Sequence, residues 1–150
     1  ISVWEDYRDE LDPVIAAVLR DRVAGLWARA EALRLTNWRA REASRDGNPG
    51  PEGSVGKLMS AEMNQHIYET CMDILGAGGL LYEAGYDRKR SDGLRGPGAH
   101  PRYAFLRSRA NTIEGGTSEV MRNILGERVL GLPGDGRVDK DIPWADVPRN

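Results

Sequence analysis

The sequence predicts an all-α protein, an antiparallel helix bundle, and three observations lead to this fold class. Apolar residues recur every three or four positions over two long stretches and one short one, which is the helix period. Glycine- and proline-rich segments separate these stretches. No segment alternates apolar and polar residues in the manner of a half-buried strand. Because only three amphipathic helices are evident, we expect the bundle to be incomplete in this chain.

The composition is that of an ordinary soluble domain. The formal net charge of -2 over 150 residues offers no basic excess for nucleic acid or an anionic membrane surface. No apolar run approaches the roughly 20 residues of a membrane span. Cys71 is the only cysteine and the two histidines lie far apart, so we expect no metal site and a reducing compartment, the cytoplasm. Since the chain begins at Ile1, we expect it to belong to a longer polypeptide.

The first helix is expected from about Pro13 to Arg45. Asp12 can cap its N-terminus, and Pro13 suits the first helical position because it has no N–H to satisfy. At about 1.5 Å per residue this helix spans roughly 50 Å, so it needs other long helices beside it. The segment DGNPGPEG at 46–53 ends it. The expected buried stripe comprises Ile15, Leu19, Val23, Leu26, Ala30, Leu33 and Asn37.

The second helix is expected from Ser54 to about Leu75. The glycines of GAGG at 76–79 end it, because glycine readily adopts the left-handed conformation of helix C-termini. The expected buried stripe comprises Val55, Leu58 or Met59, Met63, Ile67, Thr70 and Ile74.

The rest of the chain is expected to be less regular. Residues 85–102 are polar and glycine-rich, which indicates a solvated loop, and 102–111 form a short apolar patch. A third helix begins at Ser118 and is closed by Gly131 and Pro133. We therefore expect one helical domain over 1–133 and an extended tail over 134–150.

Residues 112–122, TIEGGTSEVMR, place two glycines and two hydroxyls directly before the third helix. A helix N-terminus presents unpaired N–H groups and a partial positive charge, which favour a phosphate. Gly115 and Gly116 would let a ligand approach the backbone, and Thr117 and Ser118 add hydroxyl donors. The same residues also make an ordinary turn with an N-cap. The stretch lacks the lysine and the preceding strand of a P-loop, so a nucleoside triphosphatase is not indicated.

The surrounding sequence resembles a known family. Residues 105–133, FLRSRANTIEGGTSEVMRNILGERVLGLP, are similar to the C-terminal signature of the acyl-CoA dehydrogenases, a G-T-S-E-[IV]-x-R run followed by A/G-E-R-x-L-G. Residues 73–80, DILGAGGL, resemble the Q-[IVL]-x-G-G-x-G segment of that family. The resemblance covers about 14–133. It implies the C-terminal four-helix bundle of these enzymes without its first helix.

This resemblance implies an FAD-dependent oxidoreductase of fatty-acid or lipid degradation. A carboxylate would remove the α-proton of an acyl-CoA thioester while the β-hydrogen leaves as hydride to the flavin. The implied partners are acyl-CoA, an electron-transferring flavoprotein, and further subunits of a homo- or hetero-oligomer in which FAD lies across a dimer interface. Residues 1–150 alone are expected to be inactive and to self-associate through their open apolar seam.

The family's cofactor contacts carry over onto two segments of this chain. Gly76 and Gly78 match the segment that approaches the FAD of the partner subunit. Asp73 stands where a glutamine is usual, and a carboxylate cannot donate to a pyrophosphate as an amide can. The positions that match contacts along FAD near the third helix are Gly115, Gly116, Thr117 and Glu119.

The resemblance implies a catalytic base at one of two places in the family fold. Many members carry it as the Glu of Y-E-G-T, which aligns with Gly115 here, and Glu114 lies one residue earlier. Other members carry the glutamate on the first bundle helix, which this chain lacks. We favour a base outside these 150 residues or on a partner subunit, with Glu114 as the candidate within them.

Two further hypotheses remain open. The missing glutamate at position 115 motivates a non-catalytic scaffold or partner subunit of a heteromeric acyl-CoA dehydrogenase-like complex. An unrelated three-helix protein with a capped turn would require the match over 105–133 to be chance. Upstream sequence separates the first alternative from an enzyme, because a glutamate that faces the flavin from the preceding helix favours catalysis.

Overall fold

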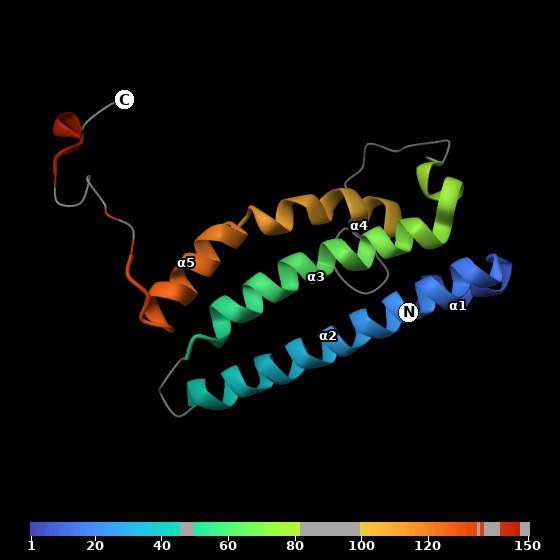
Figure 1. The fold of residues 1–150 in the computed structure, drawn as a ribbon, viewed down its shortest axis with the longest axis horizontal. Coiled ribbons are helices and arrows are strands. Elements are labelled where there is room, and N and C mark those ends of the chain that lie inside the picture. Colours follow the sequence, from blue (N-terminus) through green and yellow to red (C-terminus); the bar gives the residue numbers. More distant parts are fainter. Residues whose placement is uncertain (46–49, 82–99, 135, 137–141, 148–150) are drawn as a thin grey trace.

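The computed structural model describes residues 1–45, 50–81, 100–134, 136 and 142–147, and these residues form helices and no strand. Three helical rows lie side by side (Figure 1). The central row, α3 (Glu52–Leu75), runs antiparallel to α2 (Pro13–Arg45) on one side and to a third row on the other. The third row consists of α4 (Pro101–Ser108), the 3₁₀ turn η4 (Arg109–Thr112) and α5 (Ser118–Arg128). The predicted all-α, incomplete bundle is confirmed.

The predicted bounds of α2 are confirmed. The Asp12 carboxylate accepts a hydrogen bond of 2.9 Å from the Val14 N–H, so Asp12 caps the helix as its side-chain chemistry predicts. Leu19 and Leu33 are buried against α3, but Ile15, which we expected in the same stripe, is exposed. The reason is that α2 packs chiefly against α3 alone, so only a narrow strip of its surface is covered.

Helix α3 begins at Glu52, two residues before the expected Ser54, because Pro51 serves as the N-cap and its carbonyl accepts from the Ser54 N–H. The helix ends at Leu75 as predicted, and Gly76 has φ +54°. The chain then continues as the 3₁₀ turn η2 (Gly76–Leu80). The buried residues of α3 are Gly56, Ala61, Thr70 and Ile74.

The short apolar patch at 102–111, to which the sequence analysis assigned no helix, is helical. Helix α4 begins at Pro101, within the expected loop, and the turn η4 follows it. Ala104 and Ser108 are its buried residues, four positions apart and therefore on one helical face. Contact with α3 along this face stabilises a helix of only two turns. Residues 85–99 of the expected loop at 85–102 lie outside the described residues.

Helix α5 begins at Ser118 as predicted and ends at Arg128, before Gly131 with φ +65°. Two helical segments were not predicted, α1 (Ser2–Tyr7) and the 3₁₀ turn η1 (Arg8–Glu10), which precede α2. In the described part of the tail, Trp144–Asp146 form one 3₁₀ turn (η5), which the aperiodic sequence did not indicate.

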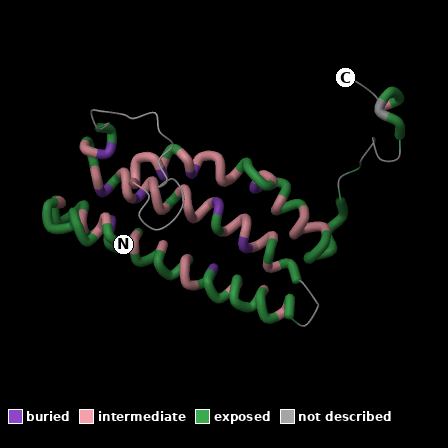
Figure 2. The backbone as a smooth tube through the Cα atoms, turned by 180° about the vertical axis from the view of Figure 1, so that it is seen from behind, coloured by how far each residue is buried: buried purple, intermediate pink, exposed green. Residues whose placement is uncertain are grey.

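Burial is uneven across the three rows. Figure 2 shows α3 mostly buried or half-buried, whereas α2 is exposed on every side except the one that faces α3. Trp27 and Trp38 of α2 remain more than half exposed, at 58% and 57%. The buried hydrophobic residues of the described chain are small in number: Leu19, Leu33, Ala61, Ile74 and Ala104. This distribution is what an incomplete bundle predicts.

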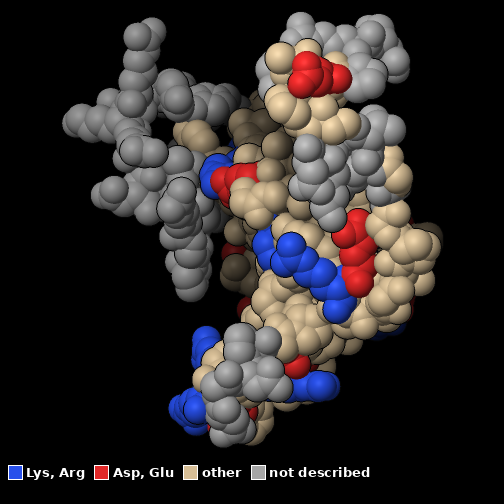
Figure 3. Space-filling model, turned by 90° about the vertical axis from the view of Figure 1, so that its left-hand side faces the viewer, with Lys and Arg blue, Asp and Glu red and all other residues tan. Residues whose placement is uncertain are grey.

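The surface charge and the apolar character of the described helices bear on whether the chain has a charged interface or a membrane span. On the face that Figure 3 shows, basic and acidic side chains lie next to one another rather than in one patch of a single sign. Among the described helices, none combines the length and apolar character that a membrane crossing requires. In the same residues, no three His, Cys, Asp or Glu side chains come together as metal ligands would.

Candidate functional site

The stretch TIEGGTSE forms a tight turn between η4 and α5. Gly115 has φ +66° and Gly116 has φ +101°, conformations that L-residues rarely adopt. A Cβ atom on Gly116 would lie 2.6 Å from the terminal methyl of Met121, which would have to move. Both glycines are therefore required by the backbone itself, independently of any ligand.

Helix α3 fastens this turn through Lys57. The Lys57 ammonium donates to the Asn111 carbonyl at 3.1 Å and also to the Gly116 carbonyl. The Asn64 amide of the same helix donates to the Asn111 side chain at 2.6 Å. Sequence reasoning missed Lys57, because a single lysine at the edge of an apolar stripe carries no local signal for such a role.

The N-terminus of α5 carries both a cap and a carboxylate. Thr117 Oγ1 accepts from the Val120 N–H at 3.2 Å. The backbone N–H of Glu119 and then the Thr117 hydroxyl hold the pKa of the Glu119 carboxyl below its ordinary value. The positive end of the helix is thus already matched by a negative charge. Ser118 is buried, with 5% of its surface exposed, and its hydroxyl has no hydrogen-bond partner among the described residues.

These residues open onto a groove of about 420 Å³ between α3 and α5. Glu62 of α3 and Arg122 of α5 form an ion pair across it. The groove is lined by Glu62, Gln65, His66, Thr112, Ile113, Thr117, Ser118, Glu119 and Arg122. Two of the predicted cofactor positions, Thr117 and Glu119, therefore face one polar hollow.

Glu114 lies on a different side of the turn, where a groove of about 380 Å³ is lined in part by Lys57, Asn64 and Asn111. Arg107 donates to both Glu114 carboxylate oxygens, at 2.8 and 2.7 Å, and Asn111 donates to one of them at 2.8 Å. These three hydrogen bonds tie the Glu114 carboxylate to α4 and η4. The structure therefore gives Glu114 a role in holding the turn.

The second predicted cofactor segment lies in η2. Arg102 of α4 donates to the Gly78 carbonyl through two nitrogens, Nε at 3.1 Å and Nη2 at 2.8 Å. Asp73, near the end of α3, forms an ion pair with Arg22 of α2. The carboxylate that replaces the usual glutamine is therefore accompanied by a guanidinium, which can donate.

The structure does not bring the two predicted segments together. Lys57 marks the position of the TIEGGTSE turn along α3, and Asp73 marks that of η2. At about 1.5 Å per residue these two residues are separated by roughly 24 Å along the helix. A single chemical group of a ligand cannot contact both segments of the same chain. Each segment therefore has its own candidate site.

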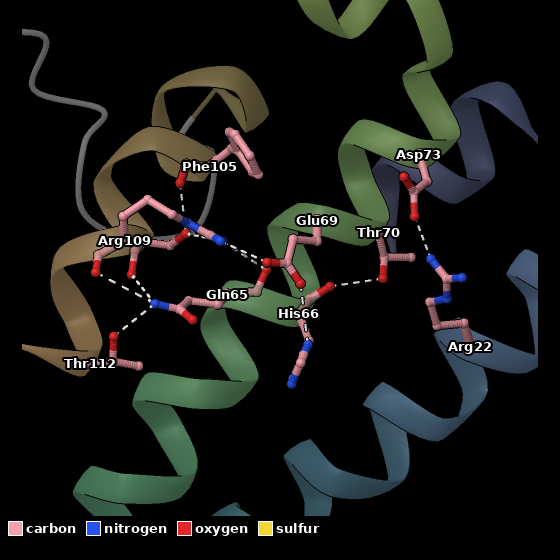
Figure 4. A network of polar contacts seen from close by, with 10 residues as sticks. Arg22, Gln65, His66, Glu69, Thr70, Asp73, Phe105, Arg109 and Thr112 are labelled. Carbon is pink, nitrogen blue, oxygen red and sulfur yellow. Dashed lines mark hydrogen bonds and ion pairs between the residues drawn. The ribbon is translucent and has the colours of Figure 1, made fainter. Parts of the chain in front are cut away.

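A polar network between α3 and α4 lies between these two sites (Figure 4). Arg109 donates to Glu69 at 2.7 Å, and its guanidinium lies 4.7 Å from the centre of the Phe105 ring. The Gln65 amide donates to Thr112 at 3.0 Å. The Arg109 hydrogen bond is the largest cause that lowers the pKa of the Glu69 carboxyl. Arg109 of η4 thus joins the third row to α3.

Comparison with known proteins identifies the family. Residues 13–130 match the family described as "Acyl-CoA dehydrogenase, C-terminal domain". The chain belongs to the acyl-CoA dehydrogenase family. This confirms the resemblance that TIEGGTSEVMR and its flanking residues indicate. No solved structure matches the chain.

The curated relatives are other acyl-CoA dehydrogenases. "Acyl-CoA dehydrogenase IpdE1" of Mycolicibacterium smegmatis is 33% identical over 81% of this chain and 26% of the relative. The IpdE1 protein of Mycobacterium tuberculosis is 32% identical over 84% of this chain and 29% of its own length. "Acyl-CoA dehydrogenase FadE26" of Mycobacterium tuberculosis is 34% identical over 74% of this chain and 27% of its own length. The chain thus spans less than a third of each of these acyl-CoA dehydrogenases.

Proposed function

We propose that this chain is the C-terminal portion of an FAD-dependent acyl-CoA dehydrogenase, which forms a double bond between the α and β carbons of an acyl-CoA thioester. The observation that carries the proposal is the TIEGGTSE turn within a family match. Two left-handed glycines lead into a capped helix start, and Thr117, Ser118 and Glu119 at that start line one polar groove.

The chemistry of this groove fits the hydroxyl-bearing parts of FAD. The Glu119 carboxylate at the start of α5 disfavours a phosphate there, but it can accept hydrogen bonds from sugar hydroxyls. The residues that would hold FAD are Gly115, Gly116, Thr117, Ser118 and Glu119. When bound, FAD would supply the acceptor for the β-hydrogen as hydride.

The η2 segment fits a negatively charged part of the cofactor instead. Arg22 supplies the donors that Asp73 lacks, and Arg102 fixes the peptide of Gly78. Because this segment lies roughly 24 Å along α3 from the first turn, it would serve the FAD of a partner subunit. The proposal therefore includes an oligomer, with identical or different subunits. An electron-transferring flavoprotein and a cytoplasmic location complete it.

The acceptor of the α-proton is proposed to be a carboxylate outside residues 1–150. Within them Glu114 is the candidate, and its hydrogen bonds to Arg107 and Asn111 favour a supporting role. Gly115 cannot simply be replaced by the glutamate of other family members, because its φ of +66° would strain that side chain's backbone.

A second candidate function is a scaffold or partner subunit in a heteromeric complex of the same fold. The engaged Glu114 and the glycine at position 115 favour it. An enzyme and a scaffold differ in one respect that can be measured, since only the enzyme reduces its own flavin.

The experiment uses the full-length protein that contains this chain, purified without denaturation. Its visible absorption spectrum is recorded under anaerobic conditions before and after acyl-CoA is added. The proposal expects a flavin band that bleaches. A flavin band that never bleaches with any acyl-CoA would favour the scaffold, and a colourless protein that takes up no added FAD would overturn the proposal.

A further inference from the structure

We propose that Lys57 is a positioning residue of the flavin site, which aims the N–H groups of the TIEGGTSE turn at the cofactor by holding two carbonyls of that turn. The inference rests on the proposed function, because FAD is the ligand that the turn would bind. It adds a residue that lies far from the turn in sequence, 54 positions before Asn111 and 59 before Gly116.

The contacts of Lys57 span the whole turn. Its half-buried ammonium donates to the carbonyl of Asn111, where η4 is ending, and to that of Gly116, just before the cap of α5. A Cβ atom on Gly115 would lie 3.9 Å from Cε of Lys57, so the turn passes directly over the lysine side chain. One ammonium thus closes the loop that separates η4 from α5.

Peptide geometry converts these carbonyl contacts into an orientation of N–H groups. The described residues contain no cis peptide bond. In a trans peptide the C=O of one residue and the N–H of the next point in opposite directions. Because the Gly116 carbonyl points toward Lys57, the Thr117 N–H points away from it. That N–H has no acceptor among the described residues, so it is available to a ligand.

The glycines explain why a side chain from another helix is needed to fix the orientation of the turn's peptides. Gly116 has no side chain and a φ of +101°, so the peptide that follows it can rotate more freely than one between ordinary residues. A charge-assisted hydrogen bond from a side chain anchored on α3 selects one orientation. The Asn64 amide adds a second tie from α3 to Asn111 at 2.6 Å.

Lys57 also leaves a positive charge at the turn. Within the described residues its hydrogen bonds go to two neutral carbonyls. A cation near a bound flavin favours the reduced form, which carries more negative charge. Loss of this charge should therefore lower the flavin reduction potential, an effect that a purely structural residue would not produce.

The test uses the full-length protein with FAD removed and added back. Lys57→Met removes the donors and the charge, Lys57→Arg keeps both, and Lys57→Gln keeps a donor without charge. Arg34→Met is the matched control, because Arg34 is an exposed cation on α2 that pairs only with Glu31 of its own helix. Circular dichroism melts of the FAD-free proteins establish which variants fold.

We expect Lys57→Met to raise the Kd for FAD about tenfold or more, since hydrogen bonds from charged groups are the strong ones. Its flavin reduction potential should fall, Lys57→Arg should restore both properties in large part, and Arg34→Met should leave both unchanged. Lys57→Gln, which serves if Lys57→Met does not fold, should also lower the potential.

The outcomes separate this inference from the proposed function. A wild-type protein that binds FAD, together with Lys57 variants whose Kd and potential are unchanged, would overturn the inference alone. A wild-type protein that binds no FAD would overturn the proposed function and this inference with it.

Discussion

The two glycine turns of this chain are fastened in similar ways, yet they need their glycines for different reasons. A basic side chain holds backbone carbonyls in each, Lys57 in the TIEGGTSE turn and Arg102 in η2. In the first turn, Gly116 is required by its positive φ, and a side chain there would also displace the end of Met121. In η2, Gly78 has no positive φ, and a Cβ atom on it would meet nothing within 4 Å.

This difference indicates which of the two turns another molecule approaches closely. The glycines of TIEGGTSE are explained by the fold of this chain alone. Gly78 is not, and a glycine without a conformational or steric reason in its own chain is consistent with close approach by another molecule. The proposed contact with a partner subunit's cofactor supplies such a molecule.

The largest expected effect comes from Gly116→Val. A β-branched residue at φ +101° with Met121 in the way should destabilise folding by about 1–3 kcal/mol. We expect a lower urea midpoint and loss of FAD from the full-length protein. Gly25→Ala is the control, because Gly25 lies inside α2 with open space around it and should gain about 0.5–1 kcal/mol. Equal stability of Gly116→Val and wild type would refute the geometry of the first turn.

The next effect is that of Arg102→Met, which removes both hydrogen bonds to the Gly78 carbonyl. We expect a loss of about 1–2 kcal/mol, as for hydrogen bonds that involve a charged group. Chemical unfolding of the full-length protein measures it. If η2 contacts a partner's FAD, flavin affinity should fall as well. A variant with wild-type flavin affinity and stability would show that η2 does not depend on the Arg102 hydrogen bonds.

Gly78→Ala sharpens the comparison because it should do little to the fold. With nothing within 4 Å of the new methyl group, we expect stability to change by less than about 0.5 kcal/mol. FAD affinity of the oligomer should nevertheless decrease, since the methyl group blocks an approach from outside the chain. Unchanged affinity in a flavin titration would remove the argument that a partner's cofactor meets η2.

The smallest effect concerns Glu69, which lies between the two turns. Its pKa is lowered, chiefly by Arg109, so the ion pair stabilises the folded state at a pH above the ordinary value for Glu. This contribution disappears as the pH falls through the lowered pKa. Both side chains are more than a third exposed, so we expect at most about 1 kcal/mol. Glu69→Gln should make the free energy of unfolding less dependent on pH between neutral and acidic solution; an identical pH profile would contradict this.

The sequence predicted those elements whose signals are local. Asp12 and Pro13 mark the start of α2, Gly76 ends α3, and Thr117 caps α5, because each acts on backbone groups within a few residues. Helix α4 was missed since a segment of two turns depends on packing against α3 rather than on its own periodicity.

The glycines and hydroxyls of the candidate site were singled out from the sequence, whereas the residues that support them were missed. TIEGGTSE is contiguous, so its glycines and hydroxyls can be read together. Lys57 meets its partners 54 and 59 positions away. Arg107 of α4 meets Glu114 across the 3₁₀ turn η4. Such long-range pairs have no spacing rule in a single sequence.

The central claim is that backbone N–H groups of the TIEGGTSE turn bind FAD. Hydrogen–deuterium exchange of the full-length protein, measured without FAD and after its addition, tests this most directly. We expect slower amide hydrogen exchange over 115–119 when FAD is bound, with little change in the exposed middle of α2. Exchange over 115–119 that stays the same while FAD binds would show that the cofactor lies elsewhere.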